Sequence, residues 1–294
     1  MSEATGALKW GVGRRLEFIE FRLFWEGAIN RADLVEVFGV SVPQASKDLT
    51  LYQERAPGNM EYDTSGKRYV AAEKFVLRFL DPDPHVYLAQ LRSLAEGSVP
   101  SHDSWIAALP CAEVAITPTR AINVGVLRKI LEACREGVSI DIFYQSMSAS
   151  WPDPIWRRIT PHAFGFDGFR WHARAYCHIE HKFKDFLLPR IMDVGSKAKP
   201  GERGEQDWLW NNYFDVIMGP HPALTPSQKK VVAKDYGFDL GNDVLTVRYA
   251  MLFYVLKRLG LLGDAASKSA YTQHIVTLNQ KETEAALEKA ELQL

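Results

Sequence analysis

An alternating run of basic, polar and aromatic residues near the middle of the chain could bind an anionic ligand. In a strand, every second residue of Arg170–Cys177 points to the same side. One side would carry Arg170, His172, Arg174 and Tyr176, and the other Trp171, Ala173, Ala175 and Cys177. Guanidinium groups bind phosphate with a fork of donors, and His and Tyr can stack on a base. We predict that the first side is an exposed cationic surface and that Trp171 is a core residue.

The charge of the surrounding segment points to the same kind of ligand. Between residues 155 and 190, seven Lys or Arg residues stand against three acidic residues, and four of the eight histidines lie there. The whole chain of 294 residues has a formal net charge of only −1, so this excess is local. A nucleotide or another anion is therefore a plausible partner for this segment.

Two short patterns in the same region could instead serve catalysis. His178 and His181 have half of a metal-site spacing, and Asp167 with Glu180-x-Lys182 has the order of residues found in Mg²⁺-dependent nucleases. Hairpin turns explain both patterns more simply, and the sequence has no P-loop, Gly-x-Ser-x-Gly or His-Glu-x-x-His motif. We therefore expect no catalytic residue, no metal and no cofactor, and keep a metal-dependent nuclease as the weaker alternative.

A second group of polar residues, near the N-terminus, could contact double-stranded DNA. Gln44 can bond an adenine edge through two atoms, Lys47 can reach guanine or phosphate, and Ser41 at a helix N-terminus suits a phosphate. Lys67 and Arg68 follow a turn, where they could contact the flanking backbone. The candidate DNA-contacting residues are Ser41, Pro43, Gln44, Ser46, Lys47, Thr50, Lys67 and Arg68.

These residues would be positioned by three helices and a hairpin. Helices are predicted over Arg14–Trp25, over Arg31–Phe38 with Asn30 as N-cap and Gly39 as stop, and from Ser41 to about Glu54. Strands follow at Met60–Tyr62 and Lys67–Ala71, on either side of a Gly-containing turn. This order is that of a winged helix-turn-helix, and we expect a DNA-binding domain over 1–95. Further helices are predicted over Glu73–Leu80 and Val86–Leu94, before a linker over 96–122.

The central region is predicted to be rich in strands. After a helix from Asn123 to Glu136, strands are expected at Val138–Gln145, Arg157–Pro161, Phe169–Cys177 and Phe183–Pro189, with a turn at Asp167-Gly168. Ser196–Gln206 resembles an exposed linker, a helix is expected over Leu224–Tyr236, and a short strand over Asp243–Tyr249. The expected fold class is α+β, with one domain over 123–195 and a C-terminal extension over 196–294.

Composition limits where the protein works. Hydrophobic residues make up 47% of the chain, as in a packed globular protein, and no apolar stretch is long enough to cross a bilayer. Met1–Leu8 lacks the basic and apolar regions of a secretory signal, and three separated cysteines do not suggest a disulfide framework. We expect a cytoplasmic protein without a membrane partner.

The central segments resemble the WYL domain of bacterial transcription regulators. The resemblance lies in Ile140–Tyr144, Ile159–His162, Trp171–Tyr176 and Phe186–Ile191. The family's Trp-Tyr-Leu stands here as Trp171-His172-Ala173, which is similar to the form in winged helix-turn-helix WYL repressors of the BrxR/CapW type that accompany phage-defence systems such as BREX and CBASS. Ser41–Leu49 and Pro57–Asn59 resemble the same subgroup.

The resemblance implies an Sm-like (SH3-like) β-barrel for the central domain and a C-terminal α/β extension that dimerises. It also implies a surface for a nucleotide or nucleic-acid effector. Matched position by position, that surface comprises Tyr144, Ser146, His162, His172, Arg174 and Arg190. Other roles remain open for these residues: Tyr144 could be a packed strand residue, His162 could satisfy a turn, and the arginines could pair with Asp185 or Asp193.

The sequence therefore predicts a homodimeric repressor of a phage-defence operon. It would bind an inverted-repeat operator in double-stranded DNA and leave it when an effector binds the WYL domain. The alternative of another class is a ligand-binding scaffold protein that does not bind DNA, and the nuclease is a third. A scaffold would show no salt-dependent affinity for duplex DNA, whereas binding to DNA phosphates weakens as salt rises.

Overall fold

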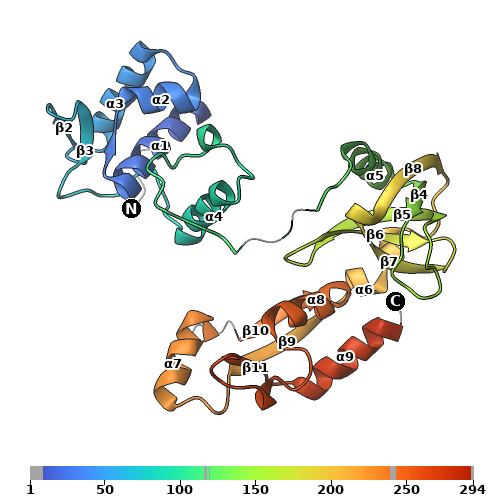
Figure 1. Ribbon diagram of the computed structural model, residues 1–294. Coiled ribbons are helices and arrows are strands. Elements are labelled where there is room, and N and C mark those ends of the chain that lie inside the picture. Colours follow the sequence, from blue (N-terminus) through green and yellow to red (C-terminus); the bar gives the residue numbers. More distant parts are fainter. Residues whose placement is uncertain (1–8, 116–117, 119, 239–242, 293–294) are drawn as a thin grey trace. The chain divides into compact units, whose positions relative to one another are not determined.

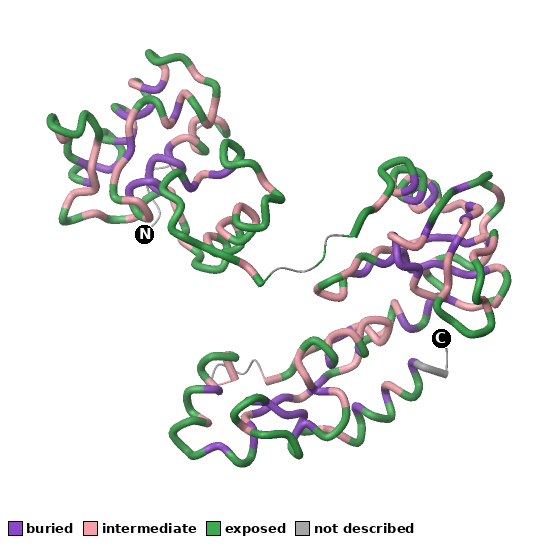
Figure 2. The backbone as a smooth tube through the Cα atoms, in the orientation of Figure 1, coloured by how far each residue is buried: buried purple, intermediate pink, exposed green. Residues whose placement is uncertain are grey.

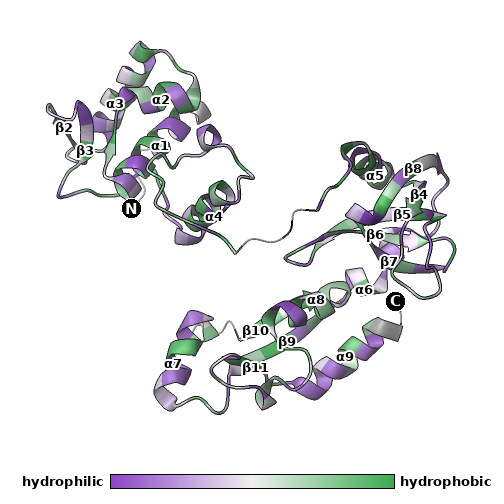
Figure 3. Cartoon of the chain, in the orientation of Figure 1, coloured by the Kyte–Doolittle hydropathy of each residue, from purple (hydrophilic) through white to green (hydrophobic). Residues whose placement is uncertain are grey.

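The computed structural model describes residues 9–115, 118, 120–238 and 243–292, and the chain divides into two compact units, Met1–Ile116 and Thr117–Leu294. Figure 1 shows the elements of each unit. No helix among the described residues is long and apolar enough to cross a membrane, and the helices mix hydrophilic with hydrophobic residues (Figure 3).

The first unit is a winged helix-turn-helix, as predicted. Its helices are α1 (Trp10–Glu26), α2 (Arg31–Phe38), α3 (Val42–Arg55) and α4 (Pro84–Ala95), with a 3₁₀ turn at Ser101–Asp103. Its strands are β1 (Ala28–Ile29), β2 (Met60–Asp63) and β3 (Arg68–Ala71), in the order β1-β3-β2. Apolar side chains of α1, α2 and α3 form the core, which includes Phe18, Leu34 and Leu49. Figure 2 colours the buried stretches of the backbone purple.

The helix predicted over Glu73–Leu80 is wrong, because side chains satisfy that segment's backbone instead. The backbone N–H groups of Arg78, Phe79 and Leu80 donate to the buried carboxylate of Glu20 over 2.6–3.0 Å. The side chain of Asn59 bonds both the N–H and the carbonyl of Val76. A buried carboxylate with four donors, including the Tyr52 hydroxyl, fixes this segment against α1.

The second unit begins with α5 (Val124–Glu136) and a five-stranded antiparallel sheet. The strands are β4 (Ser139–Tyr144), β5 (Ile155–Phe166), β6 (Trp171–Cys177), β7 (Lys182–Leu187) and β8 (Ile191–Ala198). Their order is β7-β6-β5-β4-β8, so the sheet is open between β7 and β8 in the described residues, and the Sm-like barrel is not confirmed. The linker predicted from Ser196 is wrong at its start, because Ser196–Ala198 completes β8 alongside β4.

The rest of the second unit forms a smaller α/β layer with its own core. It consists of α6 (Trp208–Asn211), β9 (Tyr213–Pro220), α7 (Pro226–Asp235), β10 (Val244–Arg248), α8 (Tyr249–Leu259), β11 (Ile275–Thr277) and α9 (Gln280–Leu292). The strand order is β10-β9-β11. The predicted helix over Leu224–Tyr236 and strand over Asp243–Tyr249 are confirmed as α7 and β10.

Candidate functional site

The helix-turn-helix is set by capping residues. The Asn30 side chain accepts hydrogen bonds from the N–H groups of Ala32 and Asp33, and Asp33 accepts one from the N–H of Asn30, so α2 begins with a capping box. Gly39 ends α2 with a φ of 63°, a left-handed conformation that favours glycine. Ser41 Oγ then accepts from the N–H of Gln44, and α3 begins. These local contacts define where α2 ends and where α3 begins.

The predicted contacts on α3 differ in how free their side chains are. Pro43, Lys47 and Thr50 are exposed, as is Ser41 at the cap. The Gln44 amide instead donates to Asp48 Oδ1 over 3.0 Å. The hydroxyls of Ser46 and Thr50 donate to backbone carbonyls one turn earlier. Gln44 must leave Asp48 before it can bond a base, whereas Lys47 is available as it stands.

The wing and the start of α2 add basic side chains to this surface. Lys67 is exposed with a φ of 49°, and Arg68 is exposed with its Nε 3.8 Å from Asp63. Asp63 also accepts from two N–H groups of the turn, which orders it. Arg31 was missed from the sequence: it is exposed, and its Nη1 lies 3.5 Å from Ser46 Oγ on α3. The signal in the sequence is a basic residue directly after the N-cap Asn30, at the start of the helix that precedes α3.

In the second unit, three of the six predicted ligand residues lie together at the end of β4. Tyr144 is buried, and its hydroxyl accepts from the N–H of Leu187 over 3.2 Å. The N–H of Gln145 donates to the carbonyl of Arg190 over 3.1 Å, which places the residue before Ser146 beside Arg190. Among the described residues the Arg190 side chain has no ion pair, so Asp193 does not neutralise it.

Arg157 belongs with this group and was missed. Its guanidinium is buried, donates to Glu180 over 3.1 Å, and leaves Nε and Nη2 without a partner among the described residues. It lies 5.7 Å from the ring centroids of both Tyr144 and Trp151. The sequence could have indicated that Arg157 is buried, because alternate residues of a strand face the same way and Ile159, two residues later on β5, is a core residue. Buried N–H donors without partners are costly and favour an acceptor from a ligand.

The exposed cationic face predicted for β6 is wrong. Arg174 has no exposed surface: it donates to Asp207 over 2.7 and 3.1 Å and to Asp185 over 3.3 Å. His162 Nε2 lies 3.0 Å from Asp207, and the Tyr254 hydroxyl donates to Asp185 over 3.1 Å. We call His162, Arg174, Asp185, Asp207 and Tyr254 the Asp207 network. The network joins the sheet to the C-terminal layer. This layer covers the face of β6 that was predicted to be exposed.

The environment of Asp207 makes its negative charge part of the fold. Burial alone would raise its pKa, but hydrogen bonds with His162 and Arg174 outweigh burial and hold the pKa at about 2. The pKa of Asp207 is lower in the folded protein than in the unfolded chain, so the ionised carboxylate stabilises the fold. This stabilisation is fully present above the unfolded pKa and is lost as pH falls through the folded pKa. From 3.8 to about 2, this amounts to about 2 kcal/mol. Between pH 4 and pH 2, urea unfolding should show that the natural chain loses about that much more stability than Asp207→Asn. Equal losses would contradict this.

His172 and Trp171 also differ from their predicted settings. His172 is buried, with Nε2 3.1 Å from Asp167 Oδ2 and its ring 5.0 Å from that of Tyr254. Trp171 is 48% exposed and packs on Phe166, so its predicted place in the core is wrong. The pairing of β6 with β7 ends at His172, and Trp171 therefore lies at the uncovered tip of the hairpin.

The carboxylates of the nuclease alternative have other partners. Asp167 accepts hydrogen bonds from the N–H groups of Phe169 and Arg170, from the Arg170 guanidinium and from His172 Nε2. Burial raises the pKa of Asp167, but these bonds outweigh burial and hold the pKa at about 2. Glu180 binds Arg157 and Lys184. Within the described ranges, no group of three or more His, Cys, Asp or Glu residues could hold a metal ion.

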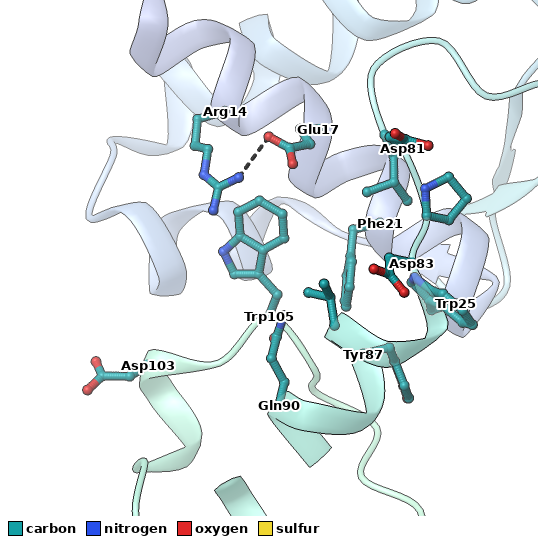
Figure 4. A pocket seen from close by; sticks show the side chains of 13 residues that line it. Arg14, Glu17, Phe21, Trp25, Asp81, Asp83, Tyr87, Gln90, Asp103 and Trp105 are labelled. Carbon is teal, nitrogen blue, oxygen red and sulfur yellow. Dashed lines mark hydrogen bonds and ion pairs between the residues drawn. The ribbon is translucent and has the colours of Figure 1, made fainter. Parts of the chain in front are cut away.

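The first unit also contains a cavity of about 270 Å³ between α1, α4 and the segment around Trp105 (Figure 4). The rings of Trp25 and Tyr87 stack at 4.6 Å, and the guanidinium of Arg14 lies 4.1 Å from the centre of the Trp105 ring while binding Glu17. The protein's own cation therefore occupies the exposed face of Trp105. These contacts connect α4 to the helix-turn-helix.

Comparisons with known proteins agree with this arrangement. The BrxR transcriptional regulator winged helix-turn-helix domain matches residues 11–93, the WYL domain matches 125–195, and the BrxR transcriptional regulator C-terminal dimerization domain matches 213–283. The DNA-binding transcriptional repressor CapW of Stenotrophomonas maltophilia is 42% identical over 283 residues, which cover 96% of this chain and 94% of the relative. CapW of Pseudomonas aeruginosa is 38% identical over 287 residues, 96% of this chain and 93% of the relative.

CapW of Escherichia coli strain KTE188 is 36% identical over 287 residues, with 96% of this chain and 93% of the relative covered. Among solved structures, the Proteasome accessory factor B/C (PafBC) of Arthrobacter aurescens aligns with all of this chain and 51% of its own, at 16% identity and a TM-score of 0.23, which is too low to support a conclusion. The identity to CapW over nearly the whole length, together with the three domain matches, decides the family. The chain belongs to the BrxR/CapW family of WYL-domain transcriptional regulators with an N-terminal winged helix-turn-helix.

Proposed function

We propose that the protein is a homodimeric transcriptional repressor that binds an inverted repeat in double-stranded DNA. The observation that carries this proposal is the α3 surface, where Lys47, Arg31 and the wing residue Arg68 are exposed on one winged helix-turn-helix. A two-fold dimer presents two such surfaces, so its half-sites are about one helical turn or a multiple apart. Relatives named DNA-binding transcriptional repressors support this proposal.

Binding to the promoter upstream of its own gene tests the proposal. Fluorescence anisotropy should give an affinity that falls steeply with salt, because phosphate contacts release counterions. Sedimentation should give a dimer. A monomer without affinity for that duplex at low ionic strength would overturn the proposal and favour the scaffold alternative.

We further propose that an anionic effector, a nucleotide or nucleic acid, binds at the end of β4 and releases the protein from a phage-defence operator. Support comes from Arg157, whose Nε and Nη2 lack partners, and from Arg190, whose charge is not neutralised within the described residues. The Tyr144 ring borders Arg157, and Ser146 directly follows Gln145, whose N–H bonds the Arg190 carbonyl. His162, His172 and Arg174 would then act indirectly, through their bonds to Asp207 and Asp167.

Repression and release are linked in this proposal. If the effector weakens operator binding by some factor, the operator weakens effector binding by the same factor. The Asp207 network is the physical connection that we assign to this coupling, because it bonds β5, β6 and β7 to α8 and the N-cap of α6.

Replacing Arg157 tests the effector site without touching the DNA surface. Arg157→Met keeps the length of the side chain and removes the buried charge, so the variant should bind the promoter duplex normally but remain repressing under inducing conditions. We expect at least a ten-fold loss of induction in a promoter–reporter assay, because a charge-assisted hydrogen bond contributes roughly 1.5–3 kcal/mol. Lys129→Met, at an exposed position on α5, is the control. Full induction of Arg157→Met would exclude this residue from the effector site.

A further inference from the structure

The second unit contains a cavity away from the end of β4, where the β5–β6 turn meets α8. It has a volume of about 400 Å³, within the range of roughly 300–1,000 Å³ found for small-molecule sites. Its walls come from two layers of the unit. We call it the junction cavity, and it is lined by Asp167, Gly168, Phe169, Arg170, Tyr254, Lys257 and Arg258.

Positive charge dominates the junction cavity. Among the described residues that line it, the one carboxylate is that of Asp167, which already bonds the turn, Arg170 and His172. Lys257 and Arg258 are exposed and have no acidic partner within the described residues. Lys257 Nζ lies 5.8 Å from the centre of the Phe253 ring, a contact that does not neutralise its charge, so both cations can bind an anion.

The side chain of Arg258 lies close against the turn opposite. Gly168 has a φ of 90°, and a Cβ built on it would lie 2.7 Å from Arg258 Nη1. The guanidinium thus lies directly over the bare backbone of the turn. Basic residues in the last turn of a helix often only offset the helix dipole. At the end of α8, however, the N–H groups of Gly260 and Leu261 already bond the carbonyls of Leu256 and Lys257, and Arg258 lies over Gly168 instead.

Two aromatic rings complete the cavity. The guanidinium of Arg120 covers one face of the Phe169 ring at 4.7 Å from its centre, and the ring is still 41% exposed, so a planar ligand packs on the part that Arg120 leaves open. Tyr254 is held by its hydroxyl bond to Asp185, with its ring beside that of His172. Flat rings next to unpaired cations suit a ligand that has both a planar base and a phosphate.

We propose that the junction cavity binds a single nucleotide, either free or at the end of a single-stranded nucleic acid. The phosphate binds Arg258 and Lys257, and the base packs on Phe169 and Tyr254. This site is separate from the effector site proposed at the end of β4. It contacts the Asp207 network through Tyr254, so occupancy changes how the C-terminal layer is held against the sheet.

Calorimetric titration of the full-length protein tests this site with three probes: AMP, a single-stranded pentanucleotide and inorganic phosphate. The comparison is made in Arg190→Ala, which removes the nucleotide site proposed at the end of β4, and there Arg258→Gln should weaken binding of AMP and of the pentanucleotide by roughly ten- to hundred-fold, the effect of one charge-assisted hydrogen bond. Phe169→Leu should weaken both by at least about five-fold and leave phosphate binding unchanged, because only the base stacks. Lys129→Gln, an exposed cation on α5, should have no effect. Thermal unfolding confirms that each variant is folded.

The pattern of results separates the possibilities. AMP binding without oligonucleotide binding identifies a free nucleotide, and tighter oligonucleotide binding identifies a strand end; both support the cavity. Binding that is lost in Arg190→Ala but unchanged in Arg258→Gln places the nucleotide at the end of β4 and overturns the proposal. No binding of AMP or the pentanucleotide at millimolar concentration also overturns it. Neither failure affects the DNA-binding proposal, which the promoter duplex tests separately.

Discussion

The double variant Lys47→Ala, Arg68→Ala is expected to bind its promoter duplex at least about 30-fold more weakly than the natural protein. Lys47 is exposed on α3, and Arg68 is exposed at the start of the second wing strand. Loss of one base or phosphate contact costs about 1–3 kcal/mol, so two contacts at the lower limit give this factor. Because each phosphate contact contributes about 0.9 to the slope of log affinity against log salt, that slope should also become shallower by about 2.

The control removes the same charge from a surface that we do not assign to DNA. Arg128 and Lys129 are exposed on α5 of the second unit, and Arg128→Ala, Lys129→Ala should retain the affinity and the salt slope within about two-fold. Fluorescence anisotropy at four or more salt concentrations measures both quantities. If the two double variants behave alike, the protein responds to net charge alone, and the assignment of α3 and the wing must be abandoned.

Gln44 separates two ways of reading DNA with the same surface. Its amide donates to Asp48, which Arg15 also holds over 2.6 Å. The side chain therefore starts from a bonded state, and a base contact must replace that bond. A phosphate contact by Lys47 needs no such exchange, which is why we rank Lys47 first for affinity and Gln44 for sequence preference.

The DNA-binding unit could be predicted from the sequence because its signals are local. Asn30, Gly39 and Ser41 act within four residues of the helix ends that they define, and the wing turn is bounded by Asp63. The exception, Glu73–Leu80, shows the limit of this reasoning. This segment has a helix-like pattern, but three of its backbone N–H groups donate to the carboxylate of Glu20, a residue far away in the chain, and it does not form a helix.

The ligand region was predicted less well because its decisive contacts are distant in sequence. Alternation along β6 correctly placed Arg174 opposite Ala173, but it could not show that Asp207 would cover Arg174 from a later segment. A strand pattern gives the face of each side chain and not what packs on that face. The same limit applies to Trp171, which has the composition of a core residue but lies at the hairpin tip.

Removing Asp207 should destabilise the second unit more than any other single change that we propose. In Asp207→Ala, Arg174 remains fully buried with Asp185 as the one carboxylate left to it in the described part of the chain, and α6 loses its N-cap. Breaking a buried ion pair in this way costs about 3–5 kcal/mol. Urea unfolding followed by circular dichroism should show this loss, whereas Asp153→Ala, at an exposed position, should remain within about 0.5 kcal/mol.

A second variant distinguishes the stability of the Asp207 network from its role in coupling. Arg174→Met combined with Asp207→Leu replaces the charged pair by apolar side chains, and such replacements restore much of the stability because Arg174 is no longer buried without Asp207. Asp185 loses its ion pair with Arg174 but is only partly buried and keeps the hydrogen bond from the Tyr254 hydroxyl. This variant should fold and bind the promoter duplex, since α3 and the wing are unchanged, but it should no longer be induced in the reporter assay. A double variant that is stable and fully inducible would show that the network serves only folding, and that the effector signal crosses the unit by another route.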